Sequence, residues 1–345
     1  MDSLSQIALG SAVGLAVMGR RTAAWKAALW GAVAGTLPDL DVVVDYGDAI
    51  LNMTRHRAES HALFYLTLLA PLLAAGVAAL HREGALWRRW WLALWLVLVT
   101  HPLLDWMTVY GTQLLRPFSD RPLGVGSVFI IDPLYTLPLL VGVAMALHGR
   151  RGRGLRWNAA GLMLSTMYLG WGVVAQQQVR EVAEASLRAE GIAAERLLVT
   201  PTPFNTVLWR VVAVTPTQYL EGYRSLLDDG PRMRWMPHDR GAPLMASHGS
   251  QVGVARIAAF SQGFFRLRDE GGRLVVTDLR MGQDPYYTFS FEVGTLAPAA
   301  AGGATALTEH AQPIPLRARP DLERGLPWLW QRLRGHDIPL PPPVR

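Results

Sequence analysis

Six apolar segments dominate the first half of the chain and constrain its fold more than any other feature. They comprise residues 7–18, 23–37, 63–80, 90–104, 134–147 and 157–174. A helix needs about 20 apolar residues to span a bilayer core, so residues 63–80 form a clear span, whereas the first two segments are short. Those two form either a pair of short helices packed through small residues or one re-entrant hairpin. The sequence therefore predicts an α-helical membrane domain of about six apolar helices over residues 1–175.

The composition agrees with a membrane protein and excludes some kinds of site. Half of the residues are hydrophobic, only 17% are charged, and the chain contains no Cys. Disulfides and thiolate zinc sites are therefore excluded, and any metal must be held by nitrogen and oxygen ligands. The net charge of +6 would suit nucleic acid, but the arginines cluster between apolar segments, which is typical of membrane topology. We expect no nucleic-acid partner, and an N-terminus without a positively charged region predicts no cleavable signal peptide.

Basic residues are distributed unevenly between the loops on the two sides of the apolar segments. The loops near residues 20–26, 81–89 and 149–156 hold ten Lys and Arg against one acid, Glu83. The loops 38–61 and 105–132 hold four Arg and eight acids. Because loops rich in Lys and Arg remain in the cytoplasm, we predict that the second set of loops lies on the outer face of the membrane.

From residue 176 onward the chain changes character. Residues 176–189 are a charged, amphipathic helix candidate, and residues 322–333 are a second short one. Between them lie β-branched and aromatic segments bounded by Gly, Pro and Asp, which predict an antiparallel sheet. These segments are residues 205–214, 218–226, 263–268, 274–279 and 286–293. We expect residues 297–320 to be an irregular loop. The prediction is a soluble α+β domain over residues 176–345, with a Pro-rich tail, on the outer face.

An imidazole and a carboxylate, His101 and Asp105, end the fourth apolar segment. Positions i and i+4 share one face of a helix, so both side chains can point at the same spot. Such a pair at the end of a membrane segment indicates metal ligands or an acid–base pair. Since the His and Asp clusters of both polar loops fall on the outer face, we expect one composite site there.

The first polar loop offers four more candidate metal ligands. His56 and His61 are five residues apart and do not share a helix face, but they converge if His56 lies in a loop and Ser60 caps the helix that carries His61. Asp39 and Asp41 flank Leu40, so an extended segment would point both carboxylates to one side. We predict Asp39, His56 and His61 as ligands, and Asp41 as a ligand or a neighbour of the ligands.

Other polar residues of these loops are candidates for catalysis and substrate binding. We predict catalytic roles for Asp41, Ser60 and Asp132, although Asp132 before Pro133 also fits a helix N-cap. The predicted substrate-binding residues are Arg57, Tyr110, Gln113 and Arg116. The two arginines would hold an anionic group or meet lipid phosphates.

These residues lie in a series of motifs that resembles the YdjM-like family of membrane-bound metal-dependent hydrolases. The resemblance is carried, in chain order, by the stretches 1–6, 29–41, 56–61, 100–105, 110–113, 117–120, 129–136, 200–206, 260–263 and 278–280. The family usually reads His-Arg-Gly-Phe-Ser-His-Ser at its second motif. Ala58, Glu59 and Ala62 depart from that pattern here, which implies altered substrate contacts, whereas both His and Ser60 are retained.

The resemblance implies a hydrolase of the bacterial inner membrane. The family's motifs are similar to those of zinc-dependent phospholipases C, which implies that His56, His61, His101 and Asp105, with Asp39 or Asp41, bind zinc or another divalent metal. The family is also associated with the LexA repressor, a partner that an outer-face domain does not favour. We therefore expect an enzyme that hydrolyses a phosphate ester or an amphiphilic, lipid-like substrate at the periplasmic interface. The alternative is a non-catalytic membrane protein whose His/Asp cluster binds metal or lipid headgroups. The sequence predicts no oligomeric state.

Overall fold

The computed structural model describes residues 1–149, 151–297, 307–317 and 321–341. The chain divides into two compact units, which are treated separately here. The helical unit comprises Met1–Val44, Arg55–Val174 and Pro203–Thr206, and the sheet unit comprises Asp45–Thr54, Ala175–Thr202 and Val207–Arg345. A helical N-terminal region and antiparallel sheets in the C-terminal region confirm the predicted fold class at this coarse level.

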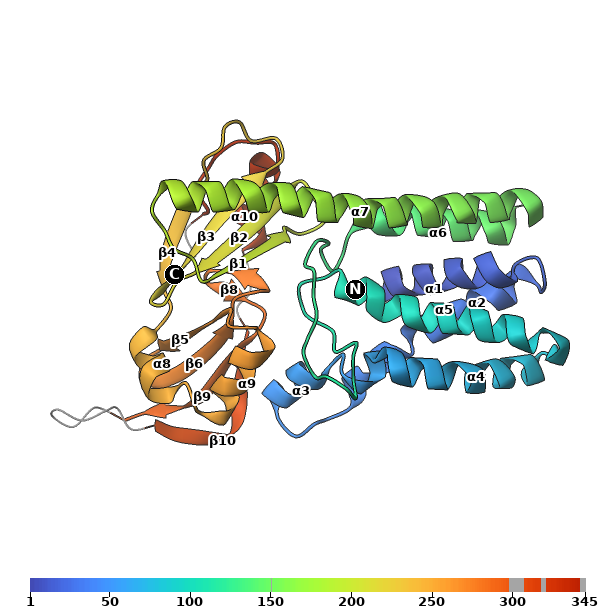
Figure 1. The fold of residues 1–345 in the computed structure, drawn as a ribbon, viewed down its shortest axis with the longest axis horizontal. Coiled ribbons are helices and arrows are strands. Elements are labelled where there is room, and N and C mark those ends of the chain that lie inside the picture. Colours follow the sequence, from blue (N-terminus) through green and yellow to red (C-terminus); the bar gives the residue numbers. More distant parts are fainter. Residues whose placement is uncertain (150, 298–306, 318–320, 342–345) are drawn as a thin grey trace. The chain divides into compact units, whose positions relative to one another are not determined.

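Long helices lie side by side in the helical unit (Figure 1). They are α1 (Ser3–Met18), α2 (Ala24–Thr36), α4 (Leu63–Leu80), α5 (Trp87–Trp106), α6 (Pro133–His148) and the first part of α7 (Arg151–Ala189). Three short 3-10 helices accompany them, η1 (Pro38–Val43), η2 (Glu59–His61) and η3 (Gly84–Leu86). The two short apolar segments at the N-terminus thus form separate helices, α1 and α2.

Glycines allow α1 and α2 to pack backbone against backbone. A Cβ added at Gly31 would overlap the carbonyl oxygen of Gly10, and one added at Gly10 would overlap that of Gly31. The contact extends to Gly35, where a Cβ would lie 2.8 Å from the Gln6 carbonyl oxygen. Small residues at such positions let helices approach closely where lipid provides no hydrophobic driving force. We call this line of contacts, formed by Gln6, Gly10, Gly31 and Gly35, the glycine seam.

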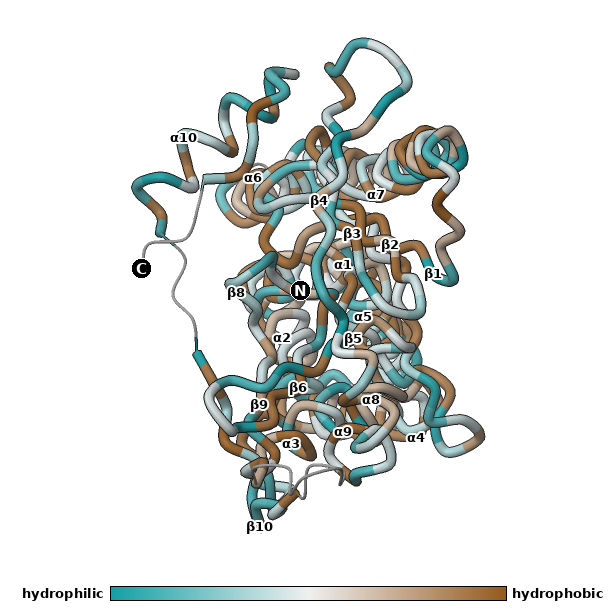
Figure 2. Tube along the Cα trace, turned by 90° about the vertical axis from the view of Figure 1, so that its left-hand side faces the viewer, coloured by the Kyte–Doolittle hydropathy of each residue, from teal (hydrophilic) through white to brown (hydrophobic). Residues whose placement is uncertain are grey.

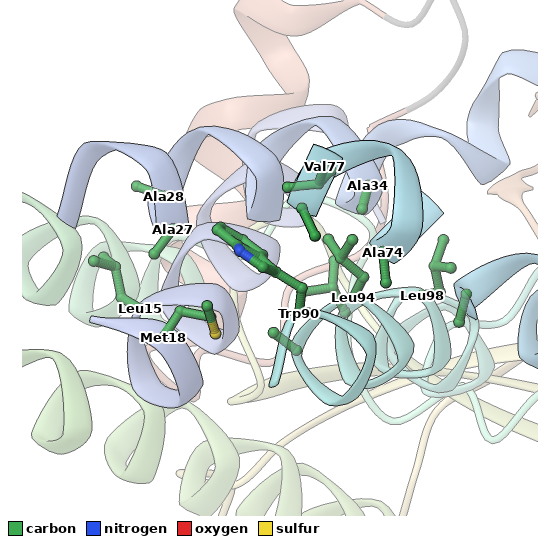
Figure 3. Close-up of a cluster of buried hydrophobic side chains, with 14 of the residues drawn as sticks. Leu15, Met18, Ala27, Ala28, Ala34, Ala74, Val77, Trp90, Leu94 and Leu98 are labelled. Carbon is green, nitrogen blue, oxygen red and sulfur yellow. The ribbon is translucent and has the colours of Figure 1, made fainter. Parts of the chain in front are cut away.

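A tryptophan fills the core between the helices at the other end of the unit. Trp90 of α5 is fully buried, and its indole lies among apolar side chains of α1, α2, α4 and α5 (Figure 3). Its Nε1 donates a hydrogen bond to Glu83 at 2.9 Å, and the same carboxylate accepts from Thr22 and Lys26. A buried indole usually finds an acceptor for its N–H, and here that acceptor also fastens the loops between the helices.

Of the helices in the described residues, α4 alone is long and apolar enough to cross a membrane, with a mean hydropathy of 2.1 over Leu63–Leu80. Much of its surface is not covered by protein, and Leu72 is 70% exposed. The helices α1 and α6 are apolar but shorter, while α5 carries Arg88, Arg89 and Asp105. One membrane span is thus supported by length and composition, and the six-span topology stays a prediction.

The sheet unit contains two four-stranded antiparallel sheets. The first has the order β1 (Arg196–Pro201), β2 (Leu208–Val214), β3 (Gln218–Ser225) and β4 (Trp235–Asp239). The second has the order β10 (Leu307–Leu316), β9 (Ser290–Leu296), β6 (Arg273–Asp278) and β5 (Phe265–Asp269), and a hairpin joins β7 (Gly282–Gln283) to β8 (Tyr286–Tyr287). The helices are α3 (Ala49–Arg55), α8 (Ala242–His248), α9 (Val252–Phe260) and α10 (Leu322–Leu333).

The structure differs from the sequence-based expectation at one long segment. The sequence predicts an irregular loop over residues 297–320. Residues 298–306 and 318–320 lie outside the described residues, and residues 307–316 form β10, which pairs with β9. Its tube is largely hydrophilic, and that of α10 alternates between hydrophilic and hydrophobic residues (Figure 2). An edge strand tolerates Pro and polar residues because one of its sides needs no ladder hydrogen bonds. The apolar alternation by which strands are recognised is therefore weak in β10.

We predict that Gly31→Ala destabilises the protein because its methyl group has no room in the glycine seam. Overpacking of this kind costs about 1–3 kcal/mol. Gly76→Ala is the matched control, since a Cβ at Gly76 has nothing within 4 Å. Thermal unfolding of the detergent-purified protein, followed by tryptophan fluorescence, measures the difference. Equal midpoints for Gly31→Ala and the parent would contradict the close packing of α1 on α2.

Candidate metal centre

Three short stretches of the helical unit bring four potential metal ligands together. Asp39 lies on η1, His61 ends η2, and His101 and Asp105 lie one turn apart on α5. Pro38 begins η1 immediately after α2, so the chain leaves the helix in a tighter turn that carries Asp39 toward α5. His61, His101 and Asp105 are fully buried, and the Asp39 side chain is 23% exposed. Each residue offers one ligand atom, and all four atoms lie within 4.8 Å of one another.

The separations of these atoms match a tetrahedral metal site. The two Nε2 atoms of His61 and His101 are 3.1 Å apart. Asp39 Oδ1 lies 3.3 and 3.5 Å from them, and Asp105 Oδ2 lies 3.2 and 3.4 Å from them. Ligands at about 2.1 Å from a tetrahedral zinc ion are separated by roughly 3.4 Å. Five of the six separations thus have the spacing of ligands around one cation, and the sixth, between the two carboxylate oxygens, is within 4.8 Å.

Hydrogen bonds at the far side of each ring show which nitrogen carries the proton. His101 Nδ1 lies 2.6 Å from the carbonyl oxygen of Gly35, and a carbonyl can only accept. In the neutral ring, Nδ1 is therefore the donor and Nε2 holds a lone pair. Ser60 donates its hydroxyl proton to Asp41 at 2.6 Å, so its oxygen accepts from His61 Nδ1 at 2.9 Å. His61 Nε2 likewise faces the centre as a lone pair.

The centre is consequently lined by acceptors that lack donors. Asp105 Oδ2 is buried and has no hydrogen-bond partner among the described residues. Two carboxylate oxygens and two imidazole lone pairs converge on one point, where a cation would satisfy all four. Burying such charge without compensation costs several kcal/mol. Two imidazole nitrogens and two carboxylate oxygens form a ligand set that suits zinc.

Asp41 supports the centre from behind the ligands. Its carboxylate accepts from His56 Nδ1 at 2.7 Å, from the Arg57 backbone N–H at 2.9 Å and from Ser60. Burial raises the pKa of Asp41, but the hydrogen bonds from His56, Ser60 and Arg57 outweigh burial, so the pKa lies below its usual value. A carboxylate that fixes the tautomer of a metal-binding His through an intervening group is a common outer-shell arrangement.

The structure separates His56 from the four potential ligands. Its ring contacts that of His61 edge to face, with centroids 6.0 Å apart, and also contacts Tyr110. Its Nδ1 is bound to Asp41, and its side chain is 27% exposed. His56 and Asp39 are thus the partly exposed residues at the centre, and the side on which they lie is called its open side.

Asp105 Oδ1, the second carboxylate oxygen, is held by cationic and polar groups. It lies 3.3 Å from Nη2 of Arg57, accepts from Gln6 Nε2 at 3.2 Å and binds the amino group of Met1. This role of Gln6 and Arg57 is not among the roles predicted from the sequence. A signal was present for Gln6, because it lies immediately before the first apolar segment, where a long polar side chain needs a partner.

Arg57 has an unusual backbone for a residue with a side chain. Its φ angle is 63°, in the left-handed region that costs an ordinary residue of order 1–3 kcal/mol. The guanidinium lies over the Tyr110 ring, 5.1 Å from its centroid, and its buried Nε has no hydrogen-bond partner in the described part of the chain. This conformation lets the backbone N–H bind Asp41 while the side chain reaches Asp105.

The remaining predicted residues occupy separate positions. Arg116 donates to Gln113 Oε1 and to Glu59 Oε1, both at 2.6 Å. Asp132 caps α6 by accepting from the Leu134 backbone N–H at 3.0 Å, and it accepts from Tyr168 at 2.8 Å. The catalytic role expected for Asp132 is therefore not supported by a contact with the four ligands, and these bonds match its alternative as a helix cap.

Comparisons with known proteins locate this centre within a recognised sequence family. The sequence model of the YdjM inner membrane protein family matches residues 1–179, which include all of the residues that form the centre. The chain is also similar to the uncharacterized protein YfhP of Bacillus subtilis (strain 168). The two are 24% identical over 239 residues, which cover 66% of this chain and 71% of YfhP. No solved structure matches the chain.

We predict that His61→Ala abolishes metal binding whereas His56→Ala retains it. The first variant removes a potential ligand, and the second removes a ring that is hydrogen-bonded to Asp41 and is not one of the four potential ligands. Metal content of protein purified from zinc-supplemented cells, measured by mass spectrometry, tests the difference, and circular dichroism checks the fold. Loss of metal in both variants would place His56 among the ligands, and full occupancy in both would refute the site.

Proposed function

The chain belongs to the YdjM inner membrane protein family, and from this premise we propose that it is an integral membrane metal-dependent hydrolase. One observation carries the proposal. Four buried or half-buried acceptors, Asp39 Oδ1, His61 Nε2, His101 Nε2 and Asp105 Oδ2, converge within 4.8 Å at the end of a helix that also carries apolar residues. A structural core gains nothing from such a convergence, whereas a metal-binding site requires it.

Each neighbouring group has a distinct task in this proposal. Asp39, His61, His101 and Asp105 would hold a divalent ion, most simply zinc, which when bound lowers the pKa of a coordinated water to about 7 and polarises a substrate oxygen. Asp41 and Ser60 keep His61 in the tautomer that presents Nε2. His56, oriented by Asp41, holds or moves a proton at its Nε2 on the open side of the centre.

The proposed substrate is a phosphate ester or another amphiphilic, anionic molecule. Arg57 is the cation that would bind the anionic group of the substrate. Its guanidinium lies beside Asp105, next to the centre, and its Nε has no acceptor within the described ranges. Tyr110 packs against that guanidinium and would keep it in place. Gln113 and Arg116 hold each other and would border the substrate. Arginine suits phosphate because its planar fork offers several parallel donors.

We also propose a multi-pass topology with the centre on the periplasmic side. The acidic loops that carry the centre alternate along the chain with loops rich in Lys and Arg, and the positive-inside rule assigns the latter to the cytoplasm. In this topology the membrane domain ends near residue 175, where α7 continues from the helical unit into the sheet unit. Residues 176–345 then form a periplasmic domain.

One observation favours a second candidate function, a non-catalytic metal site. Four protein ligands fill the coordination of a tetrahedral zinc ion, which is typical of structural sites, whereas catalytic sites keep one position open. If Asp39, the most exposed of the four, stays bound, no position remains for water. Turnover separates the two candidates, since only the enzyme hydrolyses a substrate.

We predict that chelation abolishes hydrolysis of phospholipids or lipid-linked phosphates by the purified protein and that zinc restores it. Asp105→Asn should lower both metal content and turnover by at least about tenfold, because an amide oxygen is a poorer zinc ligand than a carboxylate. Asp120→Asn, at an exposed acid of the same loops, is the control and should retain both. Full metal and no turnover on any phosphate ester would support the non-catalytic alternative. Unchanged zinc and turnover in Asp105→Asn would refute the mechanism.

We predict that a reporter active only in the cytoplasm is silent when it is fused to the C-terminus. The physical reason is the excess of Lys and Arg on one set of loops combined with an even number of crossings. A periplasm-specific reporter at the same position should be active in a parallel fusion. A strong cytoplasmic signal would reverse the proposed orientation.

A further inference from the structure

The short helix that provides Asp39 also displays exposed apolar side chains. On η1 and the residue after it, Leu40 is 57% exposed, Val42 73%, Val43 79% and Val44 47%. Asp41, between them, points inward and is bound by His56 and Ser60. One element thus presents acids to the metal centre and apolar groups to its surroundings.

A second loop of the helical unit exposes apolar groups in the same manner. Leu115 is 49% exposed and Phe118 79%. The Phe118 ring meets that of Phe64 edge to face, with centroids 5.6 Å apart, and the Leu114 carbonyl accepts from the backbone N–H of Leu63 at 3.1 Å. This loop is therefore attached to the first turn of α4. We call Leu40, Val42, Val43, Val44, Leu115 and Phe118 the apolar rim.

The apolar rim continues the exposed apolar faces of the neighbouring helices. On α2, which leads into η1, Trp25, Leu29 and Val33 recur every four residues, the spacing of one helix face, and are 55%, 47% and 44% exposed. On α4, Phe64, Leu68 and Leu72 show the same spacing and are 42%, 56% and 70% exposed. The face of α4 belongs to the helix best suited to span a membrane.

Water is an unfavourable environment for such a surface. Each Å² of exposed apolar surface costs about 25 cal/mol relative to an apolar environment, and contiguous patches beyond a few hundred Å² mark contact with a partner or a membrane. The exposed side chains at 40 and 42–44 include no charged group. Their continuity with α2 and α4 favours lipid over a protein partner.

We infer that the apolar rim inserts into the outer leaflet of the bilayer, so that the open side of the metal centre, at Asp39 and His56, faces the boundary between headgroups and acyl chains. The occupant of this surface is phospholipid. The inference rests on the proposed function and narrows it, because a substrate that reaches the centre along this route arrives from the bilayer with its acyl chains beside the rim.

The absence of cysteine from the chain makes the inference directly testable. Val43→Cys and Phe118→Cys, each labelled with an environment-sensitive fluorophore, are reconstituted in phosphatidylcholine vesicles that contain nitroxide lipids. Leu72→Cys on α4 reports the membrane span, and Glu270→Cys, an exposed position of the sheet unit, reports water. Metal content of every labelled variant is measured in parallel.

The rim labels should emit at shorter wavelength than the Glu270 label and be quenched most by nitroxides near the headgroups. The Leu72 label should be quenched most by nitroxides deep in the acyl chains. Quenching at Leu72 but not at Val43 and Phe118 overturns the inference while leaving the membrane protein intact. Absence of quenching at all these positions refutes the membrane span itself. Rim labels that are shielded from lipid nitroxides, together with an intermolecular disulfide in the same variants before labelling, would show that another copy covers the rim and would overturn the inference.

Discussion

The charge of Asp105, a carboxylate with no exposure to solvent, is the constraint on which the helical unit depends. Water cannot stabilise it, so the protein must supply every compensating group. One carboxylate oxygen contacts the guanidinium of Arg57, which lies in a loop, and the side-chain amide of Gln6, which lies on α1. The same oxygen binds the amino group of Met1, just before α1. The other oxygen faces two imidazole lone pairs and has no donor within the part of the chain that the structure describes. The first half of this arrangement organises α1 and α5, and the second half leaves a place for a cation.

Local periodicity and loop parity predicted much of this centre. The i, i+4 spacing of His101 and Asp105 placed both on one helix face, and the alternation of basic and acidic loops brought Asp39 and His61 to the same side. The structure does bring these four residues together. That His61 is a potential ligand and His56 is not could not be predicted from the sequence, because the difference depends on a left-handed backbone at Arg57 and on two 3-10 helices. Neither feature has a strong local signature in a sequence.

In the sheet unit, too, only some of the elements could be predicted from the sequence. Strands with clear alternation, such as β2 and β6, were recognised, whereas β1 and β10 were not predicted. β2 is buried along its whole length, so its β-branched and aromatic residues are conspicuous. β10 lies at the edge of its sheet and contains two Pro residues. Its formation depends on pairing with β9, which precedes it in the sequence. β-propensity is assigned to single residues, whereas the formation of an edge strand depends mainly on its contacts with the neighbouring strand.

The glycine seam has a consequence for the choice of metal. It ends at Gly35, whose carbonyl holds His101, and at Gln6, whose side chain holds Asp105. The Gly35 carbonyl belongs to the backbone of α2, so the spacing between α1 and α2 bears directly on the position of His101, whereas the link from α1 to Asp105 passes through the Gln6 side chain. Divalent ions differ in ligand distance by only a few tenths of an ångström. A methyl group added along the seam would displace Gln6 or Gly35, so the fit of the proposed ion would depend on residues that do not contact it.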